Sequence, residues 1–502
     1  MANFAIKQTA LAVSAVLGGL SFMPAAQAVN LATDGLGEAM TWSYYSVNGG
    51  NSTLFNIINT SDQTVAGRLR FRESRNSRDV YDIVVLLSPY DYWNGIVEFD
   101  PTAGATLRTT DTDTCTIPAL NTPTARAFKT RDLNDGGPTD VSRLREGYFE
   151  FIQMGSVTGE VACSRATTLF TENSTSKGGA AALTAVKAAF PNYAPNPLKG
   201  VANIINVAGW NTAYQPTVFA NFFDPTTPGD NLISLHLPPN FQNIPIDDVE
   251  SRFQASWYEP TLASTNTAAQ VLTADGVLHT SAGDNASGAN AISYLLSRTD
   301  VINTWSERLM SEGAAWDTST ALVLTLPTKG FYVDRSPTNM AATGYQYVRG
   351  LPTNGITGAP APAQFTSSWG WSTTTGPTSC DPIRISLYDR EENLYDDPPV
   401  TSPWGQGYEI CNEANVITFR GGNPLFSNNP YNVDFDTAVF PADAGWIDIN
   451  LESPANVWVN PALPGYAGLP VIGFGYTYRD QGTDAGVRDS VSYEHAYKRN
   501  LP

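Results

Sequence analysis

The sequence predicts a mainly β protein: two β-sandwich domains of the Ig-like or Greek-key type, with a short helical insert and long loops. Apolar runs of strand length, broken by polar turns, recur through residues 29–235 and again through 320–502. Between them, residues 236–319 are rich in loops and carry an extended helical pattern. These three ranges are the predicted N-terminal domain, connecting region and C-terminal domain.

Residues 1–28 have the three parts of a secretory signal peptide. Lys7 supplies positive charge, residues 10–23 are apolar, and residues 26–28 (Ala-Gln-Ala) form a cleavage site. The mature chain should start at Val29, and no later stretch is apolar enough to span a membrane. We therefore expect a secreted protein, extracellular or at the cell surface, without membrane insertion.

The clearest strand lies at residues 65–72, where apolar residues alternate with Arg68, Arg70 and Arg72. This period of two predicts a strand with an apolar face in the core and a solvated arginine face. The alternative is that the arginines form a binding stripe for acidic partners. The acidic residues that follow, Glu73, Asp79 and Asp82, argue against this alternative. Further strands are predicted at 54–59, 80–87, 147–154, 201–207, 321–326, 331–333, 383–388, 416–419, 446–451 and 469–478.

Helical spacing occurs in two places. Residues 178–190 are rich in alanine and end before Pro191. Residues 290–310 carry apolar side chains at helical spacing, with Thr299 and Asp300 as a fresh N-cap, so two short helices are predicted there.

In the segment that follows the signal peptide, residues 29–47, apolar and polar residues alternate only in part. It is expected to be an N-terminal strand of its own sandwich. The alternative is that it donates a strand to a neighbouring copy and builds a filament.

The charge balance limits the partners. The chain has 48 acidic and 29 basic residues, a net charge of −19, which disfavours nucleic acid and anionic membranes. We expect the partner to be a second copy of the chain, another surface protein or, as the alternative, a glycan.

Four cysteines in an exported chain predict two structural disulfides. Four cysteines allow three pairings, of which we choose the sequence neighbours, Cys115–Cys163 and Cys380–Cys411. Each would stabilise the fold by roughly 3–4 kcal/mol. No C-x-x-C spacing occurs, which argues against thiol–disulfide exchange and zinc.

The sequence offers no catalytic motif. His236, His279 and His495 are scattered, and neither G-x-S-x-G nor H-E-x-x-H occurs. Each histidine is interpreted as structural, and the chain as not an enzyme. A glycosidase pair of carboxylates is left open, because any acidic sequence offers such pairs.

Calcium is the one cofactor that the sequence suggests. Asp132, Asn134, Asp135 and Asp140 gather side-chain oxygens around a Gly-Gly turn, and calcium needs only oxygen ligands. The spacing departs from an EF-hand loop, because the fifth position is a glycine and the twelfth an arginine. A solvated turn is the alternative, and the acidic loop at 389–397 is a weaker candidate.

Aromatic side chains in loops could stack on sugar rings, or they could belong to the core or to an interface. They are Trp210, Tyr214, Trp257, Tyr258, Trp369 and Trp371.

Six segments carry a resemblance to known proteins: 71–80 (FRESRNSRDV), 87–91 (LSPYD), 146–150 (EGYFE), 326–334 (LPTKGFYVD), 388–392 (YDREE) and 468–474 (GLPVIGF). In these the chain resembles an uncharacterised family of exported, β-rich bacterial surface or secreted proteins. The resemblance implies a secreted or surface β-protein, and it brings no activity, cofactor or catalytic residue.

Together these observations predict a non-catalytic extracellular structural or adhesive protein of the cell surface or matrix, able to self-assemble. The alternative is a secreted carbohydrate-binding or carbohydrate-active protein.

Overall fold

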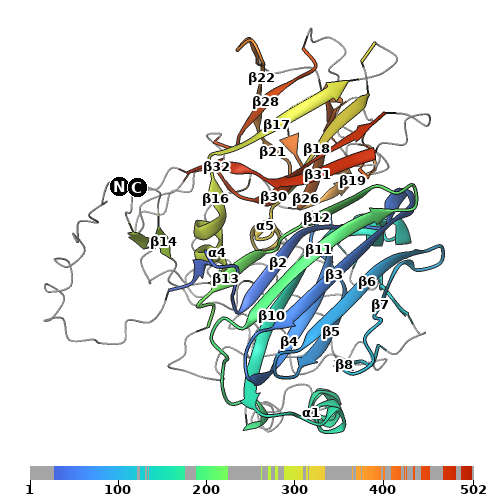
Figure 1. Ribbon diagram of the computed structural model, residues 1–502, viewed down its shortest axis with the longest axis vertical. Helices are drawn as coiled ribbons and strands as arrows, with labels where there is room; N and C mark the ends of the chain where they lie inside the picture. The colour runs from blue at the N-terminus through green and yellow to red at the C-terminus, as the bar shows by residue number, and fades with distance from the viewer. Residues whose placement is uncertain are drawn as a thin grey trace, which may run out of the picture.

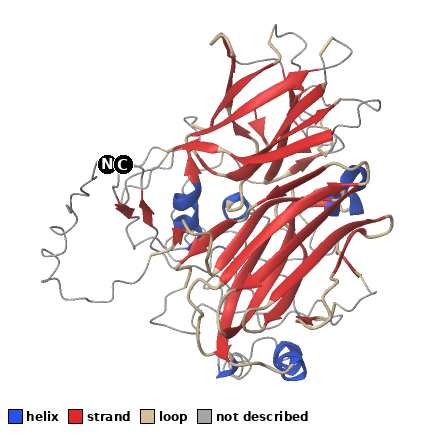
Figure 2. Ribbon diagram, in the orientation of Figure 1, coloured by secondary structure: helices blue, strands red, loops and turns tan. Residues whose placement is uncertain are grey.

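The computed structural model describes residues 28–499 with internal gaps, of which 176–187, 224–261, 334–364 and 453–466 are the longest. Strands account for 57% and helices for 9% of the described residues, against the 20–25% strand of an average globular protein. The prediction of a mainly β protein is confirmed (Figure 2). Among the described residues, no helix is both long and apolar enough to cross a membrane.

The first half of the chain, residues 28–223, forms two antiparallel sheets that pack face to face (Figure 1). Sheet I has the strand order β1-β13-β2-β10-β4-β5-β8 and sheet II the order β12-β11-β3-β6-β7-β9. The strands of sheet I are β1 (Asn30–Leu31), β2 (Ala39–Ser46), β4 (Gln63–Glu73), β5 (Asp79–Leu87), β8 (Cys115–Ile117), β10 (Glu146–Thr158) and β13 (Thr217–Ala220). Those of sheet II are β3 (Asn51–Asn59), β6 (Tyr92–Asp100), β7 (Gly104–Arg108), β9 (Arg126–Ala127), β11 (Leu198–Asn206) and β12 (Asn211–Tyr214).

Aromatic rings fill the space between these two sheets. The ring centroid of Phe55 in sheet II lies 4.8 Å from that of Phe149 and 5.8 Å from that of Phe71, both in sheet I. Trp42 of β2 stacks on Phe149 at 4.7 Å. Leu69 and Phe71 of β4 are fully buried in this core, as their alternation predicts.

Two glycines let aromatic rings lie directly on the backbone of a neighbouring strand. A Cβ atom added at Gly67 would lie 2.1 Å from Cζ of Phe151, and one at Gly95 would lie 2.2 Å from Cζ of Phe55. Because close-packed atoms cannot approach so closely, the packing of these rings requires glycine at both positions.

The second half, from residue 270 onward, contains two further sheets. Sheet III has the order β23-β22-β28-β17, with β32 also paired to β17, and sheet IV has the order β24-β27-β26-β18-β30-β31. The end of β17 pairs with β18 and so joins the two sheets. Their strands are β17 (Asp300–Arg308), β18 (Asp317–Thr325), β22 (Arg384–Asp389), β23 (Leu394–Asp396), β24 (Val400–Thr401), β26 (Ala414–Phe419), β27 (Val433–Phe435), β28 (Ala444–Asn450), β30 (Ile472–Asp480), β31 (Arg488–Glu494) and β32 (Ala496–Lys498).

The central strands of sheet IV, β18 and β26, are buried on both faces. Leu322 of β18 belongs to a core with Ile385 and Ile447 of sheet III. The next residue, Val323, belongs with Phe474 to the core of the first half. One hydrophobic core therefore runs across the boundary between the two halves.

The edges of β12 and β31 meet along a seam made by side chains. Ser490 Oγ donates to the carbonyl of Asn211 at 2.7 Å, and Arg488 Nη1 donates to that of Ala208 at 2.8 Å. The hydroxyl of Ser492 donates to the carbonyl of Ala213. Alternate side chains of β31 thus donate to carbonyls of β12 and of the turn that precedes it.

Short helices and small ladders complete the described structure. The helices are α1 (Cys163–Thr175), α4 (Gly288–Leu296), α5 (Lys329–Val333) and the 3₁₀ turns η1 (Asn48–Gly50) and η2 (Val141–Arg145). The ladders pair β14 (Gln270–Leu272) with β15 (Leu278–Thr280), β16 (Ser297–Arg298) with β29 (Leu469–Pro470), β19 (Trp371–Ser372) with β20 (Gly376–Pro377), and β21 (Asp381–Pro382) with β25 (Glu409–Ile410).

The prediction of a second helix beginning at Thr299 is wrong. The chain leaves α4 and enters β17, whose residues Val301, Asn303, Trp305 and Glu307 are all buried. This is a period of two, but polar residues occupy two of the four inward positions and hide the alternation in the sequence.

Three other predicted segments have different outcomes. Residues 331–333 belong to α5 and not to a strand, which corrects that prediction. The helix predicted at 178–190 lies almost entirely outside the described residues. In the segment 29–47, β1 pairs with β13, and β2 pairs with β13 and β10 of its own sheet, as the intramolecular interpretation expects.

Candidate functional site

A cleft of about 610 Å³ lies where the two halves of the chain meet. The first half contributes the residues after β1, part of β11 and the turn from β12 to β13. The second half contributes the ladder strand β16 and the strands β30, β31 and β32. Its volume falls within the range of roughly 300–1,000 Å³ that is usual for small-molecule sites.

Aromatic residues from both halves form part of the cleft wall. Tyr214 of β12 stacks on Phe474 of β30, with ring centroids 4.4 Å apart and planes inclined by 14°. The hydroxyl of Tyr214 donates to the carbonyl of Tyr44, and burial raises the pKa of this phenol well above its usual value. Tyr214 is therefore a fixed, neutral wall residue. Tyr493 and Tyr497 line the cleft on the side of β31 and β32.

Arg298 is the buried cation of the cleft. Its Nη1 donates to the carbonyls of Leu295 and Ser297, both at 2.9 Å, and its guanidinium lies 4.8 Å from the ring centre of Tyr497. Only 6% of the residue is exposed, yet no carboxylate among the described residues forms an ion pair with it. Burial, with the nearby charge of Arg499, lowers its pKa to about 9.

Arg499 brings a second guanidinium to the same place. Its Nη2 donates to the carbonyl of Leu295, which also accepts from Arg298. Burial lowers the pKa of Arg499 to about 10, so both groups are charged at neutral pH. The carbonyl of Leu295, which accepts from both arginines, lies at the C-terminal end of α4, where cations are favoured.

The remaining charged residues of the cleft are Lys199 and Glu494, and both are exposed. Hydroxyl and amide side chains lie beside them, from Thr33, Gln215 and Ser492. The cleft therefore offers hydrogen-bonding groups, aromatic faces and fixed positive charge.

His495 lies close to the cleft in sequence but is sequestered in the core. Its Nδ1 lies 2.7 Å from Nδ2 of Asn303, and its Nε2 lies 2.9 Å from the carbonyl oxygen of Val323. Burial lowers its pKa to about 4, so the imidazole is neutral and both ring nitrogens are used. This environment is that of a structural histidine. His236 lies outside the described residues, as does the side chain of His279.

The prediction of a solvated arginine face on β4 is wrong. Arg68, Arg70 and Arg72 are each at most 2% exposed. Arg70 Nε lies 2.9 Å from an oxygen of Asp79, and Arg72 Nη2 lies 2.8 Å from an oxygen of Glu150. The neighbouring acidic residues are the partners that allow this face of sheet I to be buried.

A second buried network joins β4 to η2. Arg143 donates to both oxygens of Glu73, at 2.8 and 3.0 Å, and to both oxygens of Asp135, at 2.9 and 2.5 Å. Burial alone would raise the pKa of Glu73, but Arg143 overcomes it and holds the pKa below its usual range. The backbone N–H groups of Arg75, Asn76 and Arg78 also donate to Glu73.

Two of the four predicted calcium ligands, Asp135 and Asp140, lie at this network. Both oxygens of Asp135 are occupied by Arg143, and Asp140 caps η2 by accepting from the N–H of Ser142 at 3.0 Å. Asp132 and Asn134 lie outside the described residues. Calcium binding at this loop stays a prediction from the sequence.

The weaker acidic loop is organised by a single carboxylate. Asp389 accepts from the N–H groups of Glu391 and Asn393 and from the side chain of Asn393. Burial acts to raise its pKa, but these hydrogen bonds keep it below the usual range. This arrangement is that of a turn held by its own side chain.

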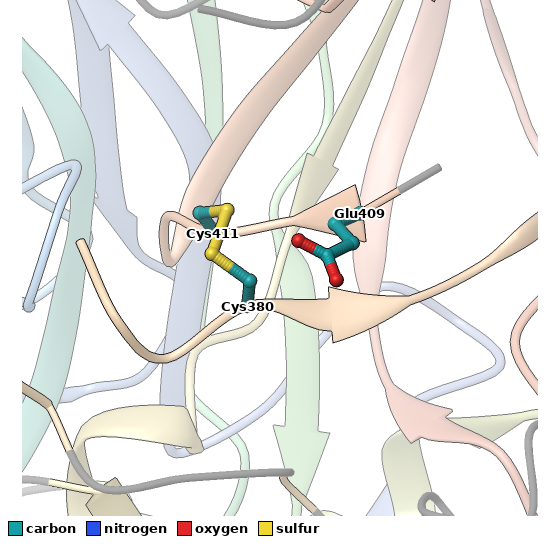
Figure 3. A group of neighbouring side chains, drawn as sticks. All are labelled: Cys380, Glu409 and Cys411. Carbon is teal, nitrogen blue, oxygen red and sulfur yellow. A yellow bond between two sulfur atoms is a disulfide. The ribbon is translucent and has the colours of Figure 1, made fainter. Parts of the chain in front are cut away.

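Both disulfides have the predicted pairing, Cys115–Cys163 and Cys380–Cys411. Two disulfides are typical of proteins in an oxidising environment. Figure 3 shows Glu409 beside the second one, and the three side chains place their ligand atoms within 4.8 Å of one another. Because both sulfur atoms are bonded to each other, neither is a thiolate that could hold a metal ion (Figure 3).

The predicted aromatic candidates are divided among different parts of the fold. Tyr214 lines the cleft, whereas Trp210 is buried against Tyr478. Trp369 and Trp371 pack near Arg143 and Arg75. Trp257 and Tyr258 lie outside the described residues.

The comparisons with known proteins return nothing. No family model matches the chain, and neither a curated protein nor a solved structure matches it. The described sheets by themselves make the chain a β-rich protein with a β-sandwich-like fold.

Four residues at the cleft could not be recognised from the sequence: Arg298, Arg499, Tyr493 and Tyr497. They are distant in sequence from the β1, β11 and β12 residues that complete the cleft, and no local motif surrounds them. The one signal in the sequence is an arginine that closely follows the apolar residues Leu295 and Leu296.

Proposed function

We propose that this chain is a non-catalytic, exported structural or adhesive protein of the cell surface or matrix, built from two Ig-like sandwich domains. The observation that carries this proposal is the use of its ionisable groups. Several of the most buried ones serve the fold, as Glu73, Asp135 and Arg143 do in their network and His495 does in the core. Charged groups committed in this way hold a shape and are not poised for proton transfer.

Electron microscopy of the purified mature chain, with size-exclusion chromatography and light scattering, tests the structural role. Regular filaments or sheets, or a defined oligomer, are expected. Monodisperse single chains at every concentration tested would overturn self-assembly and leave adhesion to a separate partner.

A second candidate function is carbohydrate binding, and the cleft between the halves favours it. Tyrosine and phenylalanine side chains beside hydroxyl and amide groups suit a polyhydroxylated ring. Binding to a glycan panel, followed by calorimetry on any ligand retained, tests this candidate. Retention of no glycan would exclude it.

A further inference from the structure

We propose that the cleft between the two halves binds an acidic saccharide, a sugar ring that bears a carboxylate, and that Arg298 receives this carboxylate. The inference rests on the second candidate function above and names its ligand class. Three features of the cleft carry it: an arginine donor without a partner, a local excess of positive charge, and a wall suited to sugar.

The first feature is the hydrogen-bonding state of Arg298. Its Nη1 is used by two carbonyls, whereas its Nε and Nη2 donate to none of the described residues, and the Nε is fully buried. Of these two nitrogens, Nη2 is the one that keeps accessible surface, so it can donate to a carboxylate oxygen of a ligand in the cleft. A donor without an acceptor costs stability, and a bound carboxylate would satisfy it.

The contrast with the other buried arginines supports this interpretation. Arg143 and Arg72 each reach at least one carboxylate inside the protein. Arg298 is buried to a similar degree and lines a cleft in place of a sealed core. The missing acid is therefore expected to come from a ligand.

The second feature is the local charge. Arg298 and Arg499 place two positive charges at the end of α4, against roughly half a negative charge from the helix dipole. Lys199 and Glu494 offset each other. A net positive cleft in a chain with a net charge of −19 marks a specific site for an anion.

The third feature is the wall. Tyr493 and Tyr497 come from the second half, while Thr33 and Gln215 come from the first. Aromatic faces can cover the apolar face of a sugar ring, and hydroxyl and amide groups can bond its hydroxyls. A simple organic acid would use only the arginine.

Isothermal titration calorimetry with trigalacturonate and with the uncharged galactotriose tests the proposal on the mature chain. The parent should bind trigalacturonate at least tenfold more tightly than galactotriose. Arg298→Gln should lose that preference, and Arg384→Gln, which removes an exposed arginine on β22 outside the cleft, should keep it.

Two exposed residues keep the test valid if Arg298→Gln fails to fold. Glu494→Gln removes the one acid among the described residues that line the cleft and should tighten trigalacturonate binding several-fold, and Lys199→Gln should weaken it. No change in either variant would overturn the anion site.

The outcomes separate the two proposals. Equal binding of both trisaccharides would overturn the acidic ligand while supporting carbohydrate binding. Binding of neither would remove both. Acetate that competes as strongly as trigalacturonate would show a site for simple carboxylates and would overturn the saccharide.

Discussion

Replacing Arg143 by methionine tests whether the buried ion-pair network holds the first half together. The residue is 1% exposed and makes four charged hydrogen bonds, two to Glu73 and two to Asp135. Methionine has a similar length and no charge, so the substitution leaves two acidic residues buried without their common partner.

The expected loss is large. Removing one partner of a buried ion pair costs about 3–5 kcal/mol, because a charge remains buried without compensation. Arg143→Lys should also be strongly destabilising, since an ammonium cannot form two forks at once. The double variant Asp135→Leu/Arg143→Met should lose less than the sum of its single changes, with a coupling of about 1.5 kcal/mol or more.

Urea unfolding followed by tryptophan fluorescence measures these differences. Arg108→Met is the matched control, because Arg108 makes a similar fork to Glu98 on the surface, with Nε–Oε2 at 2.5 Å and Nη2–Oε1 at 2.8 Å. That partly exposed pair should contribute at most about 1 kcal/mol. A loss in Arg143→Met no larger than the loss in Arg108→Met would refute the argument.

The pH dependence gives an independent check. Arg143 holds the pKa of Glu73 below its usual range against the effect of burial. A lowered carboxyl pKa stabilises the folded state at neutral pH, and this contribution is lost as pH falls through the folded pKa. The stability deficit of Arg143→Met should therefore be largest near pH 7 and shrink on acidification. A deficit independent of pH would contradict an electrostatic cause.

Three further predictions concern other parts of the fold. Burial raises the pKa of Glu146 from 4.5 to about 7; its contribution to stability should therefore fall by up to about 3 kcal/mol as pH rises from 4.5 to 7. Glu146→Gln should remove this decline in urea titrations, and an unchanged pH profile would contradict it. Gly67→Ala should destabilise by about 1–3 kcal/mol through its clash with Phe151, which thermal unfolding measures; a neutral result would show that the ring moves aside. Removing the Cys115–Cys163 disulfide by a double serine variant should cost about 4 kcal/mol in the chain-entropy model, and equal urea midpoints for the reduced and oxidised parent would contradict it.

Much of the first half could be predicted from local pattern. In β4, the alternation of Leu69 and Phe71 with arginines identified the strand and its core face. The same pattern could not show what covers the other face, because alternation only distinguishes two faces. Burial of Arg70 depends on Asp79 and Glu150, and the pairing of β10 with β4 that brings Glu150 there is a tertiary contact.

The errors in the second half have a related cause. In β17, Asn303 and Glu307 are polar residues at buried positions, so hydropathy alone favoured a helix. The cleft was even harder to predict from the sequence. Its two walls come from β1, β11 and β12 on one side and from β30 to β32 on the other, and only the packing of the halves brings Arg298 next to them.

The order of strands in sheet I has a consequence for the kinetics of folding. β1 and β2 come first in the chain, yet both pair with β13, so that Asn30 lies opposite Ala220. Contacts between such distant residues close slowly, because the entropy of a long loop must be lost before the strands can pair. During synthesis, which proceeds from the N-terminus, the edge of β2 therefore stays unpaired until residue 220 is available. Unpaired strand edges are sites of aggregation. Productive folding of this protein therefore depends on keeping β1 and β2 from pairing with other chains until β13 has been synthesised.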